Sequence, residues 1–343
     1  MEFAFSAEQD MLRVAAKEFL AERYPLDGVP AIVDGEPGWQ PESWKQLAEL
    51  GWTDDELTLL DHVVLFEETG AALLPGPLFS TIALAFPAIR KHPELVAEVA
   101  AGDLKLALAW AETGRPQGIR DADPSTSVDA DGRVTGRKTL VADAALADAF
   151  IVVTAGQQLR LVRDAKVTAL STSDQTRRLS EVEFDNAPSQ LLTEGPEVLA
   201  EIENRAFVLA AAEALGVGRR AVEDGIAYAS TRTQFGKVIG TYQAVSNQLV
   251  DSYAGLELAR SLTYWAAWSV QEDDPQADVA CAAAKTAAAE AAVFACERAI
   301  QVLGGVGMTW EHVLHRLYKR AQWLDAFGGS ARDLRARIAA TLM

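Results

Sequence analysis

Apolar side chains recur at helical spacing through the first hundred residues. Ser6 followed by Gln9 is typical of a capping box at a helix N-terminus. The apolar residues after it recur at helical spacing: Met11, Leu12, Ala15, Phe19 and Leu20. Residues 41–51 and 57–72 predict two further helices, the first opened by a proline and closed by a glycine. The pattern therefore predicts an N-terminal helical domain over residues 1–103.

The spacing changes between residues 104 and 190. Short β-prone runs lie at 104–111, 134–141, 150–154, 158–162 and 182–184. Turn signals such as Asp131-Gly132 separate them. This segment predicts a small middle β domain, an antiparallel barrel or sandwich.

From residue 191 to 343 the chain is helical again. Four long segments rich in alanine and leucine lie at 203–231, 241–271, 278–303 and 310–326. Their apolar residues occupy more than one face, which is typical of a four-helix bundle whose outer face meets another subunit. The predicted fold class is therefore α+β, with a helical domain, a β domain and a helical bundle in that order.

Composition narrows the partners and the compartment. The chain has 31 basic and 49 acidic residues, a net charge of −18, which disfavours nucleic acid and anionic membranes as partners. Cys281 and Cys296 lie in an alanine-rich helical stretch, as expected of buried thiols in a reducing cytoplasm. No uninterrupted apolar run reaches membrane-spanning length, about 18 residues. We expect a soluble cytoplasmic protein.

Two motifs could carry binding chemistry. Arg232 ends a long helix and begins the run Arg-Thr-Gln-Phe-Gly, so it could present its guanidinium to a phosphate or simply complement the helix dipole. Gln301 precedes the pair Gly304-Gly305 between two helices. Paired glycines permit close approach of a ligand, although a flexible connection would need them too. Neither motif decides between these interpretations alone.

Together, and in this order, the motifs resemble those of acyl-CoA dehydrogenases. The stretch from Tyr228 to Gln243 is similar to the long-helix motif of that family. The second C-terminal signature resembles Gln301, Gly304, Gly305, Gly307, Thr309, Glu311, Arg316 and Arg320. Similarity extends over nearly the whole chain, including the opening run 5–10 and the β segment 182–188.

The resemblance implies a helical–β–helical fold, FAD as cofactor and oxidation of the Cα–Cβ bond of an acyl-CoA. It also implies that a glutamate removes the α-proton while flavin accepts the β-hydride. In dimers of this family the FAD is shared between subunits. Arg232, Phe235, Gln301, Gly304 and Gly305 would be the residues that reach across to a neighbour's FAD.

The sequence departs from the family where a subunit serves its own active site. Gly328 stands where the family commonly has its catalytic glutamate, and Arg332 replaces a glutamine. Asn204 occupies the position that resembles the alternative base of some relatives. The flavin-binding threonines are missing from the runs 111–114 and 140–142, and residues 52–54 lack the usual glycine-rich loop.

This asymmetry suggests a subunit that completes a partner's cofactor site. The pattern resembles the smaller, non-catalytic chain of heterotetrameric α2β2 steroid acyl-CoA dehydrogenases of actinobacteria, and the segment 73–77 resembles one common in that subgroup. The resemblance implies that a catalytic partner subunit binds most of the acyl-CoA. A bulky sterol or steroid side-chain thioester would be the substrate, with no catalytic residue in this chain.

Two other interpretations remain open at this stage. A self-sufficient homo-oligomeric dehydrogenase would need a relocated base, for which Asp325 and Glu213 are candidates. A structural homologue without FAD would leave the motifs unused. His312 and His315 have ligand-like spacing beside Glu311, but no further ligand cluster accompanies them, so we predict no metal site.

Overall fold

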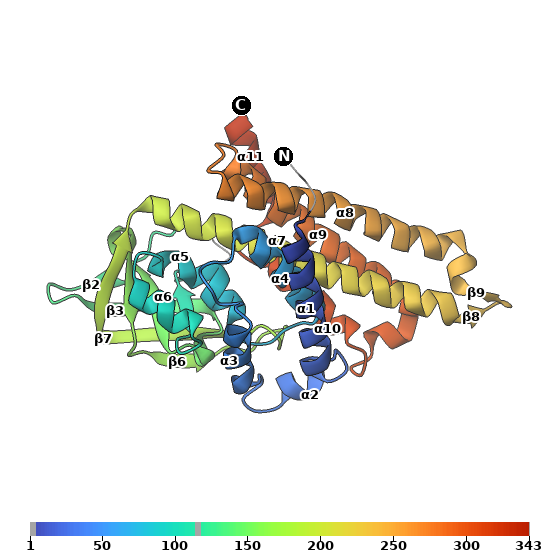
Figure 1. Cartoon of the computed structure of the whole chain (residues 1–343), viewed down its shortest axis with the longest axis horizontal. Coiled ribbons are helices and arrows are strands. Elements are labelled where there is room, and N and C mark those ends of the chain that lie inside the picture. The colour runs from blue at the N-terminus through green and yellow to red at the C-terminus, as the bar shows by residue number, and fades with distance from the viewer. Residues whose placement is uncertain (1–4, 114–117, 343) are drawn as a thin grey trace.

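The N-terminal region of the chain is helical (Figure 1). The computed structural model describes residues 5–113 and 118–342. Capping boxes at Ser6 and Thr58 start two of the helices, and the first confirms the prediction. The elements are α1 (Ala7–Arg23), α2 (Val29–Asp34), α3 (Pro41–Glu49), α4 (Leu59–Ala71), the π-helix η1 (Phe79–Ala85), α5 (Phe86–Ile89) and α6 (Pro93–Ala100). The sequence pattern missed η1 and α5 because every residue from 79 to 89 is buried, which leaves no amphipathic period.

Seven strands form the middle sheet. They are β1 (Leu106–Ala109), β2 (Ser127–Val128), β3 (Arg133–Ala142), β4 (Ala149–Thr154), β5 (Gln158–Val162), β6 (Lys166–Ala169) and β7 (Leu179–Glu194). The order is β1-β4-β5-β7-β3-β2, with β6 also paired to β7. The expectation of a wholly antiparallel sheet was wrong, since β1 and β4 are parallel. Residues 110–148, which include β2 and β3, connect them, and a parallel pair requires such a long crossover.

The long strand β7 holds this sheet together. Its first half pairs with β3 and β6, and its second half pairs with β5. The residue pattern predicted only residues 182–184 of this strand, and the family resemblance extended the expected strand to residue 188. The second half of β7 alternates weakly and lies largely at the surface, so it has little hydrophobic signal.

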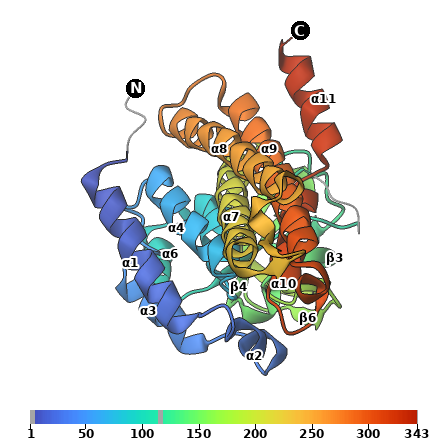
Figure 2. The same cartoon turned by 90° about the vertical axis from the view of Figure 1, so that its right-hand side faces the viewer.

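Five helices form the C-terminal region. They are α7 (Pro196–Thr231), α8 (Gln243–Gln271), α9 (Ala277–Leu303), α10 (Leu314–Ala326) and α11 (Ala331–Leu342). The four predicted helices are present, and α7 lies centrally among α4, α8, α9 and α10 (Figure 2). The last predicted helix begins at Leu314 instead of residue 310, because residues 309–313 form turns and bends after the short 3₁₀-helix η5 (Gly304–Met308). Helix α11 was not predicted.

Two glycines let α4 and α7 cross with their backbones in contact. A Cβ atom at Gly70 would lie 2.1 Å from the carbonyl oxygen of Glu213, and one at Gly216 would lie 1.8 Å from that of Glu67. No side chain fits at either position without moving a helix. This contact fixes the depth at which Glu213 enters the core.

Helix α9 is the most apolar of the bundle. With η5 it is long and apolar enough, by length and composition, to cross a membrane, although no uninterrupted apolar run had been found. Most of that segment is buried inside the protein, where α9 packs against α7, α8 and α10. Its apolar composition is accounted for by this central position. Cys281 and Cys296 are both free and buried on it.

Candidate functional site

The Arg232 motif forms a hairpin at the end of α7, far from the β-sheet (Figure 1). The hairpin consists of β8 (Thr233–Gln234) and β9 (Lys237–Val238). Its two turn residues, Phe235 and Gly236, have φ angles of +51° and +77°. A two-residue turn with both φ angles positive suits the twist of a hairpin, although a bulky residue rarely adopts that conformation. Phe235 is 94% exposed at the tip.

The Gln301 loop lies at the same end of the bundle. Val302, beside Gln301, packs in one small apolar cluster with Ala229 of α7 and Leu249 of α8. This cluster brings the loop next to the hairpin. The side chains of Arg232 and Gln301 are exposed, and within residues 5–113 and 118–342 neither makes a side-chain hydrogen bond or salt bridge.

The two glycines of the loop differ in backbone conformation and surroundings. Gly304 has φ +63° and ψ −137°, a conformation essentially reserved for glycine. Gly305 has no positive φ, and a Cβ there would meet no atom within 4 Å. Nothing among the described residues requires glycine at Gly305, so its missing side chain leaves space on the outer surface.

The position expected to hold the catalytic base is closed. Gly328 is buried with φ +69°, and a Cβ on it would lie 2.4 Å from Cε1 of Phe207. Phe207 itself is fully buried. Lys285 fixes the turn by donating hydrogen bonds from Nζ to the carbonyl oxygens of Asp325 at 2.7 Å and Gly329 at 3.1 Å. The chain therefore has neither a base at this position nor room for one.

We expect Gly328→Ala to lower the free energy of unfolding by about 2–4 kcal/mol, from left-handed backbone strain plus overpacking against Phe207. Chemical denaturation measures the change. Gly329→Ala is the matched control, because Gly329 has φ +116° but open space around its Cβ, so only strain is added. Equal losses in the two variants would show that the ring of Phe207 does not restrict a side chain at position 328.

We expect Gly328→Glu to confer no dehydrogenase activity on the isolated chain, because Phe207 leaves no room for the added side chain.

An aromatic cluster fills the volume next to Gly328. The rings of Phe79, Trp323 and Phe327 lie 5.2–5.4 Å apart between centroids. Trp110 adds an edge contact to Phe327 at 6.1 Å. The guanidinium of Arg177 covers the rings of Phe79 and Trp323 at 4.4 and 4.7 Å. A substrate chain or flavin ring could enter this space only by displacing these side chains.

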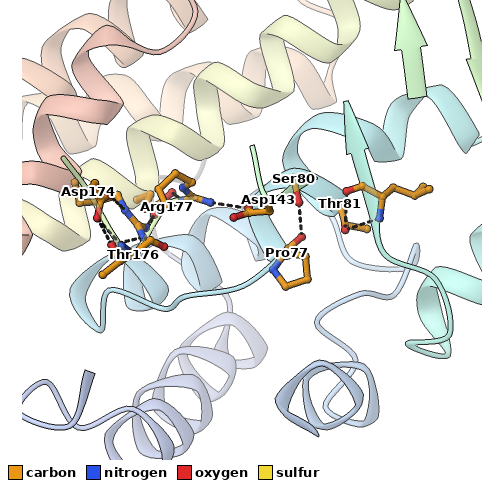
Figure 3. Close-up of polar contacts among 10 residues, drawn as sticks. Pro77, Ser80, Thr81, Asp143, Asp174, Thr176 and Arg177 are labelled. Carbon is orange, nitrogen blue, oxygen red and sulfur yellow. Dashed lines mark hydrogen bonds and ion pairs between the residues drawn. The ribbon is translucent and has the colours of Figure 1, made fainter. Parts of the chain in front are cut away.

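Arg177 also belongs to a buried ion network, in which Figure 3 labels Asp143 and Asp174. Nη2 of Arg177 lies 2.7 Å from each carboxylate oxygen of Glu213. Arg320 also binds Glu213 and reaches Asp174 through Nε at 2.8 Å. On its other side Arg177 points toward Asp143, at 3.5 Å, and burial raises the pKa of that carboxyl to about 6. Glu213 is held by two arginines in the interior, which is the geometry of a structural ion pair.

The segment expected to bind a flavin of this subunit is also engaged internally. The carboxylate of Glu112 accepts hydrogen bonds from Ser125 and Thr126 and pairs with Lys138 at 2.8 Å. These contacts hold the pKa of Glu112 well below its usual range, against the opposing effect of its partial burial. Gly114, the last residue of that run, lies outside the described residues. The resemblance places a flavin-binding threonine at Ala142, which is buried and has no polar side chain.

The side chain of Asn204, at the alternative base position, is likewise engaged in hydrogen bonds. Its amide oxygen accepts from Arg120 at 2.9 Å, and its amide nitrogen donates to Asp278 at 2.7 Å. The preceding residue, Glu203, is fully buried and binds both Arg120 and Arg337 at 2.6 Å. This network links the β-domain loop, α7, α9 and α11, and it leaves no free proton acceptor at Asn204.

Comparison with known proteins identifies the chain's family. A model of the acyl-CoA dehydrogenase C-terminal domain matches residues 197–343. Acyl-CoA dehydrogenase IpdE2 of Mycobacterium tuberculosis is 28% identical, over 96% of this chain and 96% of its own length. The chain belongs to the acyl-CoA dehydrogenase family.

Two solved structures of this family extend the likeness. One is a chain of the ChsE4-ChsE5 complex from Mycobacterium tuberculosis, 26% identical with a TM-score of 0.88, covering 100% of this chain and 99% of that chain. The other is a variant of the Tcur3481-Tcur3483 steroid ACAD, 26% identical with a TM-score of 0.87, covering 98% and 97%. The acyl-CoA dehydrogenase fold and the resemblance to steroid enzymes of the family are thereby confirmed.

Sequence reasoning missed the groups that close the site. Phe207 and Phe79 carry no local signal, because an apolar residue in an apolar helix predicts only burial. Arg177 lies in a polar run after the β6 strand and gave no sign of its two carboxylate partners. The sequence did draw attention to Glu213, since a carboxylate in the middle of a long apolar helix needs a buried cation.

Proposed function

We propose that this chain is the non-catalytic subunit of a heteromeric acyl-CoA dehydrogenase, in which it completes the FAD site of a catalytic partner subunit. The observation that carries the proposal is a contrast between two parts of the chain. The interior half is the base position at Gly328 with its surroundings, and the exposed half is the Arg232 hairpin with the Gln301 loop. The base position is packed against Phe207, whereas Arg232, Gln301 and Gly305 are exposed, and the side chains of Arg232 and Gln301 have no polar partner among the described residues. A subunit that served only itself would have little use for that exposed half.

The exposed half suits FAD held between subunits. Arg232 offers a planar fork of donors for a diphosphate, Gln301 offers a donor and an acceptor, and Gly305 leaves room for a ligand to approach its backbone. Phe235 at the hairpin tip would be covered by the partner. When bound, FAD supplies the hydride acceptor for the dehydrogenation. The interior half does not suit a flavin of this subunit's own, because the aromatic cluster and Arg177 occupy it.

The substrate we propose is a bulky acyl-CoA such as a sterol or steroid side-chain thioester. One structural relative is described as the ChsE4-ChsE5 complex, and another as the Tcur3481-Tcur3483 steroid ACAD. A subunit without an acyl pocket of its own would leave room beside the partner's pocket for a polycyclic group. Acyl-CoA would then be bound mainly by the partner, in an α2β2 assembly in the cytoplasm.

The alternative of a self-sufficient enzyme finds little support. The carboxylate of Glu213 is held in the interior by two buried arginines, Arg177 and Arg320. Asp325 lies half-buried, and its backbone carbonyl binds Lys285 at the end of α10. Neither side chain lines the clefts beside α1, α4 and α7 or the small pocket near Trp39 that the described residues form.

Flavin stoichiometry tests the proposal. We expect co-expression with the catalytic subunit to yield a yellow complex with one FAD per heterodimer, measured from visible absorbance against chain mass. Acyl-CoA should bleach that flavin in the complex and have no effect on the chain alone. One FAD per chain in the isolated protein, bleached by acyl-CoA, would overturn the proposal and favour a self-sufficient enzyme.

A further inference from the structure

A cleft lies at the opposite end of α7 from Arg232. It has a volume of about 890 Å³ and is bounded by the start of α4, the first turns of α7 and the connection between α8 and α9. Arg90 and Arg205 are its two cationic lining residues. Arg205 precedes Phe207 by two positions, so the two side chains point about 200° apart around the helix. The cleft is therefore on the other side of α7 from Gly328.

Arg205 is a buried cation without a carboxylate partner. Its side chain is 6% exposed, and no acidic group among the described residues lies within 4.0 Å of it. Nε donates to the carbonyl oxygen of Ile82 at 2.8 Å, and Nη2 lies 3.5 Å from Nδ1 of His62. Burial and the charge of Arg205 lower the pKa of His62 to about 3, so the imidazole is neutral and compensates nothing.

The environment makes that charge costly. Burial, together with the nearby charge of Arg90, lowers the pKa of Arg205 to about 9. Arg90 is itself paired, with Glu201 at 2.5 Å on the more exposed side of the cleft. The ring of Phe86, 5.6 Å from the guanidinium, and the more distant Glu201 offset this cost only in part. A buried charge without an ion-pair partner is destabilising, and an anionic ligand would supply that partner.

The rest of the lining restricts which anion fits. Apolar side chains supply much of the wall: Leu57, Leu59, Ala200, Val270 and Ala277. Four carboxylates also line the cleft, namely Glu197, Glu201, Asp273 and Asp274. Two arginines against four carboxylates give a formal charge of −2, which opposes entry of a polyanion such as a nucleotide or CoA phosphate. A single negative charge on an apolar body meets both conditions.

We propose that this cleft binds a monocarboxylate with an apolar body, whose carboxylate is received by Arg205 while its body lies along the apolar wall. The site is separate from the shared FAD site and needs no partner chain. It would let the subunit respond to, or retain, a free organic acid.

Thermal unfolding of the full-length chain with decanoate tests this. We expect a saturable rise in Tm, about 3 °C at a hundredfold excess over Kd for a chain of this size. Decanol, which lacks the charge, should give no such rise. Arg205→Met should abolish the decanoate effect. It keeps most of the volume, and the removal of a buried charge without an ion-pair partner offsets the lost hydrogen bond to Ile82, so the free chain should still fold. Arg163→Met, at a half-exposed arginine on the β domain, is the matched control.

Two results would overturn the proposal: a decanoate shift that persists in Arg205→Met, or no shift in the wild-type chain. If Arg205→Met does not fold, modification of wild-type arginines by phenylglyoxal replaces it. We then expect decanoate to protect the peptide containing Arg205 and leave that containing Arg163 unprotected. Equal modification of Arg205 with and without decanoate would also contradict the proposal that Arg205 binds the carboxylate.

Discussion

Arg232→Ala is expected to strip FAD from the heteromeric complex while leaving the subunits associated. Truncating one partner of a hydrogen-bonded charge pair at an interface costs about 2–5 kcal/mol. That range is roughly a 30- to 4,000-fold loss of FAD affinity. The variant should not disturb the fold of the hairpin, because the Arg232 side chain makes no hydrogen bond or salt bridge within the described residues. The backbone hydrogen bonds of Arg232 to Tyr228 and Ile239 do not depend on the side chain. Flavin absorbance of the complex after gel filtration measures the effect.

Two variants sharpen this experiment. Arg232→Lys keeps the charge but loses the planar fork, so we expect an intermediate affinity. Arg23→Ala removes a half-exposed arginine at the end of α1 and should leave the flavin content unchanged. If Arg232→Ala retained FAD as tightly as the wild type, the hairpin would not belong to the cofactor site.

Glu213→Gln is expected to destabilise the chain by about 3–5 kcal/mol, because it leaves Arg177 and Arg320 buried beside a neutral group. Asp174 would still bind Arg320, but Arg177 would keep only Asp143, at 3.5 Å. The network joins the β domain to α7 and α10, so the loss should appear as reduced cooperativity between these regions as well as a lower denaturation midpoint. Urea unfolding followed by circular dichroism measures both.

The same variant separates a structural glutamate from a catalytic one. A relocated base would lose activity in Glu213→Gln with little change in stability, which is the opposite of what we expect. Glu290→Gln is the matched control, since Glu290 pairs with Arg335 on the surface of α9 and α11. An exposed ion pair contributes at most about 1 kcal/mol. A small loss for Glu213→Gln, like that of the control, would contradict the structural assignment.

Periodicity predicted the long elements well and the short or buried ones poorly. The helices α1, α3, α4 and α7 to α10 each present an apolar stripe or a strong start signal, and their existence was expected. The segment 79–89 is buried on all sides, and the second half of β7 is largely at the surface, so neither has an amphipathic period to detect. The parallel pairing of β1 with β4 depends on a crossover that no local pattern encodes.

For the candidate site, too, some features were predicted from the sequence and others were known only from the structure. The amino-acid sequence by itself determined the family resemblance, the absence of a glutamate at Gly328 and the candidate residues Arg232 and Gln301, because residue types at fixed spacing are properties of the chain. Only the tertiary structure decided that Phe207 packs against Gly328, that two arginines hold Glu213 and that Arg205 is buried beside a cleft without a carboxylate partner. These facts depend on which side chains meet across helices far apart in the sequence, and packing in three dimensions alone brings them together.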